Sequence, residues 1–252
     1  MNSSIELPFN KTFLYFDTKI KNVDPTNLKE YLEEKTGREV ILRENFFDSK
    51  YSQDLPKKVA KTKVRNKSKR EFKEPLPKEV ELEGKIIKNK KDLIGILYDA
   101  QKLVKVMRDF LDDEEKKNHT VVLTKRLIGS KEKNEARYHA RTVINSVPSI
   151  VSTSGIVEGP AKPRKYYFAD EDEKEEILDF DPMKHSDDRM EEAIKSYLLQ
   201  TIFWRLEGQP FCEEDGCPLV NSHWQKDVLQ NQIEGELCER HRKKLETFKK
   251  NP

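Results

Sequence analysis

The sequence is short of cysteine, glycine and apolar residues. It has three cysteines and nine glycines in 252 residues, and its hydrophobic share is 35%, below the roughly 45–50% of an average domain. A secreted, disulfide-bonded domain usually carries more cysteines, in an even number. No apolar run approaches the roughly 20 residues that span a bilayer, and residues 1–11 contain Glu6 and no signal-peptide core. These absences predict a soluble, cytoplasmic protein with no membrane partner.

The chain also lacks a strong net charge, because 48 basic residues face 46 acidic ones and leave +2. A near-neutral chain has no overall field that would favour nucleic acid or a membrane surface. Residues 57–73 depart from this balance, with nine basic side chains and one acid, Glu71. They predict either a solvated surface or a nucleic-acid-binding or ribosome-associated segment. Base stacking would rest on Phe72 alone.

The pattern of apolar residues predicts an α/β or α+β protein. Residues 12–43 predict a β-α-β unit, in which Asp24-Pro25 begins the helix and Gly37 ends it. Amphipathic spacing predicts helices over 91–113 and 186–207, the second capped by Ser186 and ended by Gly208 and Pro210. Short β-branched runs predict strands at 120–124, 142–144 and 149–151, and 152–167 predict an irregular loop ending in a strand at 166–168.

Four parts follow along the chain: the β-α-β unit (1–44), a lysine-rich, exposed and partly flexible insertion (45–90), a core of strands and helices (91–210), and a C-terminal subdomain (211–252). The C-terminal part contains all three cysteines, as Cys212-x4-Cys217, a 20-residue spacer and Cys238-x2-His241. Two close pairs of sulfur and nitrogen ligands are what a closed, tetrahedral Zn²⁺ site requires. We therefore predict one structural zinc ion; three ordinary buried thiols and an exposed histidine are the alternative. His223 is a possible alternate ligand.

These residues resemble the C-terminal part of the archaemetzincins, which are zinc metallopeptidase-like proteins. That family has a catalytic HExxHxxGxxH helix, followed at once by a Cys-x4-Cys pair, about 19 residues and Cys-x2-Cys. His241 here replaces the last cysteine, and Leu219 replaces the methionine of the metzincin turn. The segments at 137–141, 148–153 and 155–164 further resemble an uncharacterised archaeal branch of metallopeptidase-like proteins. The resemblance implies a zincin-like mixed sheet packed with helices, followed by a zinc knuckle.

The resemblance also implies where a catalytic zinc site would lie. With Gly208 in the place of the motif glycine, the ligand positions fall on Thr201, Arg205 and Phe211, and the general base falls on Ile202. None of the four can do this chemistry, because arginine stays protonated and phenylalanine and isoleucine have no lone pair to offer. No two of the five histidines are four residues apart. The chain therefore lacks the HExxH that a zincin needs.

Three functions remain open from the sequence. The first is an inactive, archaemetzincin-like protein with a binding or scaffold role, and the second is the nucleic-acid or ribosome-associated module. The third, compatible with the first, is a surface that binds an extended peptide along a sheet edge at 149–163. Glu207 lies near the lost catalytic site. Other candidate binding residues lie in the segments of family resemblance: Arg137, His139, Glu158, Lys162 and Arg164.

Overall fold

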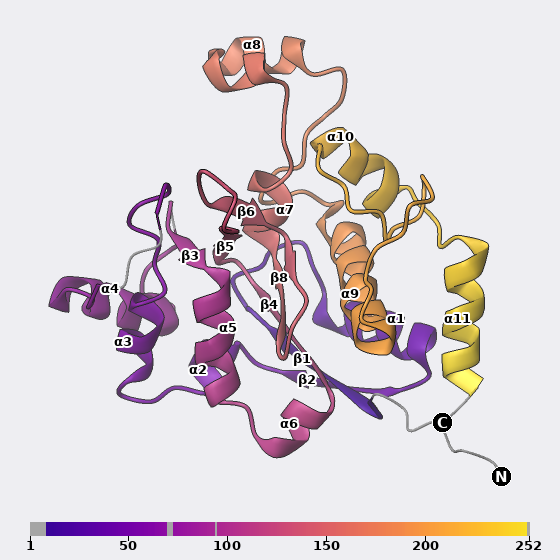
Figure 1. Ribbon diagram of the computed structural model, residues 1–252, viewed down its shortest axis with the longest axis horizontal. Helices are drawn as coiled ribbons and strands as arrows, with labels where there is room; N and C mark the ends of the chain where they lie inside the picture. The colour runs from indigo at the N-terminus through magenta and orange to yellow at the C-terminus, as the bar shows by residue number, and fades with distance from the viewer. Residues whose placement is uncertain (1–8, 70–72, 94, 251–252) are drawn as a thin grey trace.

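The computed structural model describes residues 9–69, 73–93 and 95–250 (Figure 1). Its main sheet has five strands in the order β2-β1-β4-β8-β7. Four strands run parallel, namely β1 (Lys11–Phe16), β2 (Glu39–Arg43), β4 (His119–Thr124) and β8 (Ser149–Ser152), and β7 (Val143–Ile144) is antiparallel to β8. The predicted α/β class with a mixed sheet is confirmed.

Both faces of this sheet are buried, because side chains alternate between two apolar clusters along each strand. In β1, Leu14 and Phe16 belong to one cluster, and Phe13 and Tyr15 belong to the other. The first cluster contains the buried faces of α1 (Pro25–Thr36), α9 (Met190–Glu207) and α11 (Glu239–Lys250). The second contains those of α2 (Phe46–Ser49), α3 (Leu55–Ala60) and α5 (Ala100–Asp109). Helices therefore cover the sheet on both sides (Figure 1).

The predicted β-α-β unit is confirmed in its elements and their boundaries. The Asp24 carboxylate accepts a hydrogen bond from the Thr26 backbone N–H at 2.8 Å and caps α1. Gly37 ends the helix at φ 66°, a left-handed conformation that glycine adopts without steric cost. Strands β1 and β2 then pair in parallel, with Thr12 opposite Val40.

The expectation of an exposed insertion at 45–90 is wrong for much of this segment. It forms α2, α3 and α4 (Pro77–Ile87), and Phe46, Leu55 and Ile87 are buried in the second cluster. Glu83 of α4 is also buried, where its carboxylate lies 2.6 Å from Arg126 Nη1 and 2.9 Å from Lys63 Nζ. Part of the basic run, residues 70–72, lies outside the described residues. The domain boundaries themselves stay a prediction.

The predicted helix over 91–113 is too long at its N-terminal end. Leu97–Asp99 instead form β3, which pairs with β5 (Leu127–Ser130) in a second sheet of order β3-β5-β6, completed by β6 (His139–Arg141). Asp99 then caps α5 by accepting from the Lys102 backbone N–H at 3.2 Å. A short helix, α6 (Asp113–Lys117), leads into β4.

The predicted loop and strand between 152 and 168 are also wrong. This region forms α7 (Thr153–Glu158) and a 3₁₀ helix, η1 (Arg164–Phe168). The following α8 (Glu171–Ile177) stands away from the body at the top of Figure 1. Strand β8 pairs with β4 on one side and with β7 on the other, so 149–152 offer no free sheet edge. Within the main sheet, the edge next to β8 is β7.

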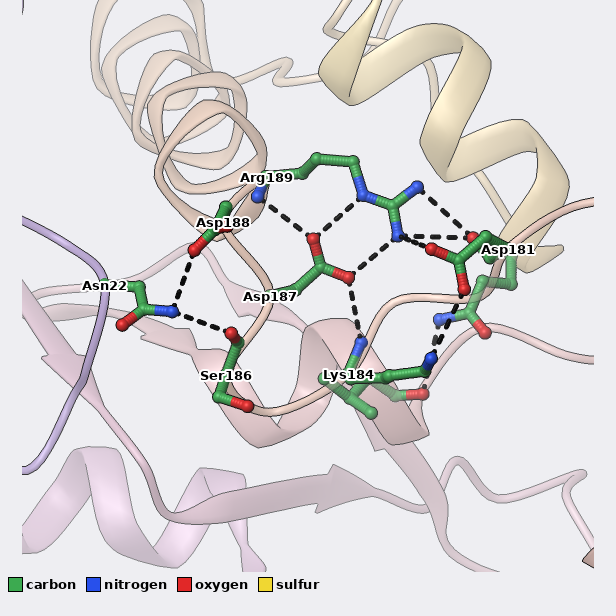
Figure 2. Close-up of polar contacts among 9 residues, drawn as sticks. Asn22, Asp181, Lys184, Ser186, Asp187, Asp188 and Arg189 are labelled. Carbon is green, nitrogen blue, oxygen red and sulfur yellow. Dashed lines mark hydrogen bonds and ion pairs between the residues drawn. The ribbon is translucent and has the colours of Figure 1, made fainter.

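Helix α9 begins at Met190, four residues later than predicted, because the preceding residues form a polar loop (Figure 2). The Ser186 carbonyl accepts from the Asn22 side chain at 2.7 Å. Asp187 accepts from the Arg189 backbone N–H at 3.0 Å and from its Nε at 2.8 Å. Ser186 is therefore part of this loop and not the helix cap. Gly208 ends α9 at φ 72°, as predicted.

The C-terminal part folds over one end of α9. It contains α10 (Gln225–Val228), a π-helical turn, η2 (Leu229–Ile233), and α11. Ser196 of α9 donates to the Gln232 carbonyl at 2.7 Å, which ties η2 to α9. Within the described part of the chain, no helix combines the length and apolar character needed to cross a membrane.

Candidate metal centre and adjoining groove

The four predicted metal ligands come together from one turn and from the start of a helix. The Cys212 N–H donates to the Leu219 carbonyl at 2.9 Å, which brings the two ends of the turn together. Gly216 precedes Cys217 at φ 81°, a conformation that favours glycine. Cys238 immediately precedes α11, and His241 lies in its first turn. All four side chains are buried.

The donor atoms are spaced as a tetrahedral ion requires. Cys212 Sγ lies 3.9 Å from Cys238 Sγ, and Cys217 Sγ lies 3.9 Å from His241 Nδ1. The Cys238 Sγ to His241 Nδ1 distance is 3.0 Å, and all four donors lie within 4.8 Å of one another. Sulfur ligands about 2.3 Å from a tetrahedral zinc ion would lie about 3.8 Å apart. The residues therefore fit such an ion.

Burial governs the protonation of two of these ligands when no metal ion is bound. Burial, followed by the Cys212 sulfur, raises the pKa of Cys217 to about 12, so without a cation this thiol stays protonated. Burial and the positive charge of Arg240 lower the pKa of His241, which keeps its imidazole neutral and able to coordinate. His223 is not part of the cluster. Its predicted role as an alternate ligand therefore has no geometric support.

A groove of about 610 Å³ lies on the other side of the turn that holds Cys212 and Cys217. Helix α9 contributes Tyr197 and Gln200 to its lining, and the edge strand β7 lines another part of it. A further wall adjoins the metal cluster, since Phe211 precedes Cys212 and residues 221–224 follow the turn that holds Cys217. Trp224, which is 52% exposed, lies on this wall. The groove and the metal cluster thus share one loop.

The four positions where the archaemetzincin resemblance would place catalytic residues have other surroundings in this structure. Thr201 and Ile202 are buried. Thr201 faces His119 of β4, with 3.0 Å between His119 Nε2 and Thr201 Oγ1. Arg205 donates to the Lys117 carbonyl at 2.7 Å. Of these positions, Phe211 alone lines the groove.

The other candidate binding residues are dispersed. His139 of β6 lines the groove, with its Nε2 3.8 Å from Glu135, whereas Arg137 and Arg164 are exposed elsewhere. Glu158 lies 3.5 Å from His185 Nε2, and Lys162 donates to the Val157 carbonyl at 3.2 Å. Glu207 forms an ion pair with Lys244 of α11 at 2.6 Å, beside the metal cluster and not in the groove.

Part of the basic run is paired with nearby acids, which weakens the case for nucleic-acid binding. Among its described residues, ion pairs within 4 Å are formed by Lys57, Lys58, Lys61, Lys63 and Arg65. Their partners include Glu74, 2.6 Å from Lys61, and Glu79, 2.7 Å from Arg65. Charges engaged in this way attract phosphate groups less strongly than free ones.

Sequence reasoning did not place Val143 or Gln200 at the groove, which both residues line. The strand predicted at 142–144 is confirmed as β7, but its position at the edge of the sheet follows only from its antiparallel pairing with β8. Gln200 precedes the position that the family motif assigns to the first ligand, but it is Gln200, and not Thr201, that lines the groove. No sequence motif marks either residue.

A mixed sheet covered by helices, with a Cys₃His cluster beside a groove, defines an α/β protein with a candidate metal site. The model of the family described as "Probable metallopeptidase family (DUF6775)" matches residues 8–248. The chain therefore belongs to this family, and the predicted resemblance to metallopeptidase-like proteins is confirmed at that level.

Two solved structures are similar to the chain at low identity. Archaemetzincin from Methanopyrus kandleri is 12% identical, with a TM-score of 0.46, and the match covers 96% of this chain and 97% of that one. A zinc-dependent peptidase from Methanocorpusculum labreanum is 13% identical, with a TM-score of 0.43, and the match covers 93% and 99% of the two chains. The comparison with curated proteins gives no match.

Proposed function

We propose that this chain is a zinc-binding member of its family that holds an extended peptide in the groove and does not cleave it by the zincin mechanism. Zinc is the ion that a buried Cys₃His set with tetrahedral spacing selects. Cys212, Cys217, Cys238 and His241 would hold it. Four protein ligands leave no position for a reactive water, so the ion would supply folding stability and no catalytic chemistry.

The absence of zincin catalysis is supported by the residues that face the groove. A zincin needs two histidines four residues apart on one helix, with a carboxylate beside them. The groove-facing side of α9 instead presents Tyr197 and Gln200. The whole sequence contains no HExxH. His139 and His223 line the groove from other elements, with His139 44% exposed on β6.

The observation that carries the peptide-binding proposal is the free edge of β7. In the antiparallel pair, Val143 lies opposite Val151, and the Ser152 N–H donates to the Thr142 carbonyl at 2.8 Å. Hydrogen-bonded and non-hydrogen-bonded pairs alternate along such a ladder, so the backbone N–H and carbonyl of Val143 point away from β8. They face the groove, where an extended peptide could add as the next strand.

Metal analysis combined with a peptidase assay tests this proposal. Purified protein should contain about one zinc ion per chain and should not hydrolyse a fluorogenic peptide library above the rate of a Cys212→Ser control. A displayed random-peptide library should yield peptides that bind and remain intact. The proposal fails if the protein holds about two zinc ions and cleaves peptides in a manner that chelation abolishes, or if no peptide binds.

A further inference from the structure

Gln200 is a buried side chain whose hydrogen-bonding capacity is only half used. Its residue is 1% exposed, and its Nε2 donates to the carbonyls of Pro218 at 3.2 Å and Val220 at 3.4 Å. Its Oε1 is buried and has no hydrogen-bond partner among the described residues. A buried amide carbonyl without a donor is uncommon in a folded protein and calls for a partner that is absent from the free chain.

The orientation of this amide follows from its surroundings. Carbonyl oxygens accept hydrogen bonds and cannot donate them, so the Pro218 and Val220 carbonyls require the nitrogen of Gln200 on their side. Oε1 must therefore point away from the turn that holds Cys217. Gln200 lines the groove and its free acceptor is buried, so a donor bound there reaches it when the side chains that cover it move aside.

The position of Gln200 fits the backbone of a peptide laid along β7. Successive N–H groups of an added strand alternate between facing its neighbour and facing away. Those that face Val143 would pair with β7. Those that face away are left for other residues that line the groove, and α9 contributes Gln200 to that lining. Strand β7 and Gln200 would thus each use a different row of hydrogen-bonding groups of one extended chain.

We propose that Gln200 Oε1 accepts a hydrogen bond from a backbone N–H of an extended peptide bound along β7. This inference rests on the proposed function, because it names a recognition contact within the same groove. The ligand class is a peptide with an unsubstituted amide at one defined position. A peptide that is methylated on that nitrogen has no proton to donate and would not fit.

The chain contains a matched control for this role. Gln232 donates to the same two carbonyls, Pro218 at 3.1 Å and Val220 at 2.8 Å, and its buried Oε1 also has no partner in the described structure. Gln232 lies in η2 and lines a different cavity, between α1 and α11. Substituting Gln232 therefore removes equivalent donors from the turn without changing the groove.

The test uses a peptide selected from a displayed random heptapeptide library, together with its derivatives methylated at each backbone nitrogen. Titration calorimetry should show one methylation that weakens binding to the parent protein about tenfold, the size of a single charge-free hydrogen bond. Gln200→Leu should bind the unmodified peptide about tenfold less tightly than the parent protein does. The same methylation should cause no further loss of affinity in this variant. Gln232→Leu should keep the full methylation effect.

The other possible results distinguish failure of the Gln200 contact from failure of peptide binding itself. If every methylation effect persists in Gln200→Leu, Gln200 is not the acceptor, although peptide binding in the groove still stands. If no peptide is selected, the proposed function fails and this inference fails with it. Should Gln200→Leu not fold, Gln200→Asn withdraws the carbonyl by one methylene and retains a polar amide. It should abolish the same methylation effect, and unchanged sensitivity would overturn the role.

Discussion

His119 Nε2 and Thr201 Oγ1 lie 3.0 Å apart in the core, where the sequence resemblance to archaemetzincins leads us to expect the position of a first metal ligand. The Thr201 hydroxyl donates its proton to the Leu198 carbonyl at 2.7 Å, so its oxygen accepts from His119 Nε2–H. The other ring nitrogen, Nδ1, is 3.2 Å from Thr12 Oγ1 and accepts from it. The contact thus holds His119 in one neutral tautomer and turns Thr201 away from the groove.

This contact predicts a loss of stability in acid. Burial, assisted by the charge of Arg205, lowers the pKa of His119 to about 3. In the unfolded chain it titrates near 6.5. As the pH falls below 6.5, the unfolded state takes up a proton that the folded state refuses, so stability falls by about 1.4 kcal/mol per pH unit until the pH nears the folded pKa.

Urea unfolding between pH 4 and pH 8 measures this effect. His119→Asn cannot titrate, so its free energy of unfolding should fall less steeply with decreasing pH than that of the parent. The pH dependence that remains in His119→Asn comes from the carboxylates, which are common to both proteins. Parallel pH profiles for the two proteins would show that folding does not lower the pKa of His119.

The metal ligands give a second prediction. Cys238→Ser should reduce the zinc content from about one ion per chain to nearly none and lower Tm by roughly 10 °C or more, since binding energy at a structural site is folding energy. His223→Ala is the matched control, because its side chain lies outside the cluster. Elemental analysis and calorimetry measure both quantities. Loss of zinc in His223→Ala with retention in Cys238→Ser would reverse the assignment.

The features that could be predicted from the sequence are those that depend on residues close together in the chain. Asp24, Pro25 and Gly37 cap α1 because capping is a local interaction. The spacing of the Cys and His residues similarly predicts the cluster, because each pair of ligands forms within one short turn. These parts of the fold and of the candidate site could be predicted from the residues alone.

Features that depend on distant partners could not be predicted. The segment 45–90 looks polar, yet the charge of Glu83 is compensated by Arg126, 43 residues further along the chain. Leu97 continues a helical spacing into α5, but pairing with Leu127 makes it part of a strand. Gln200 faces the groove and Thr201 does not, because His119 occupies the core position beside Thr201. In each case a tertiary contact overrides the local pattern.

The buried ion pairs of α4 give a third prediction. Burial alone would raise the pKa of Glu83, but Arg126 and Lys63 outweigh it and lower the pKa, so the carboxylate is charged. Glu83→Gln leaves the Arg126 cation buried and uncompensated, which should destabilise the fold by about 3–5 kcal/mol. Urea unfolding at neutral pH measures the change.

The neighbouring Glu81 provides the control for this change. It forms an exposed i,i+4 ion pair with Lys85 at 2.6 Å on the same helix. Glu81→Gln should leave stability nearly unchanged, because solvent screens exposed pairs. Equal effects of the two substitutions would mean that the ion pairs of Glu83 contribute no more to stability than an exposed pair does.

The loop shared by the metal cluster and the groove gives a fourth prediction. Residues 221–224 extend directly from the turn that contains Cys217, and Trp224 lies on the groove wall. Without zinc, the thiols lose the ion that holds this turn together, so Trp224 should become more accessible to solvent. The chain has two tryptophans, so Trp204→Phe leaves Trp224 as the reporter.

Chelation of the Trp204→Phe protein should shift Trp224 emission to longer wavelength and increase its quenching by acrylamide, and added zinc should reverse both changes. Adding Cys217→Ser should produce the shifted emission from the start and remove the response to chelator. Far-UV circular dichroism distinguishes local loosening from global unfolding, because α9 and the sheet should keep their signal. If zinc leaves and Trp224 emission does not change, the metal cluster does not hold the groove wall, and peptide affinity should then be independent of zinc.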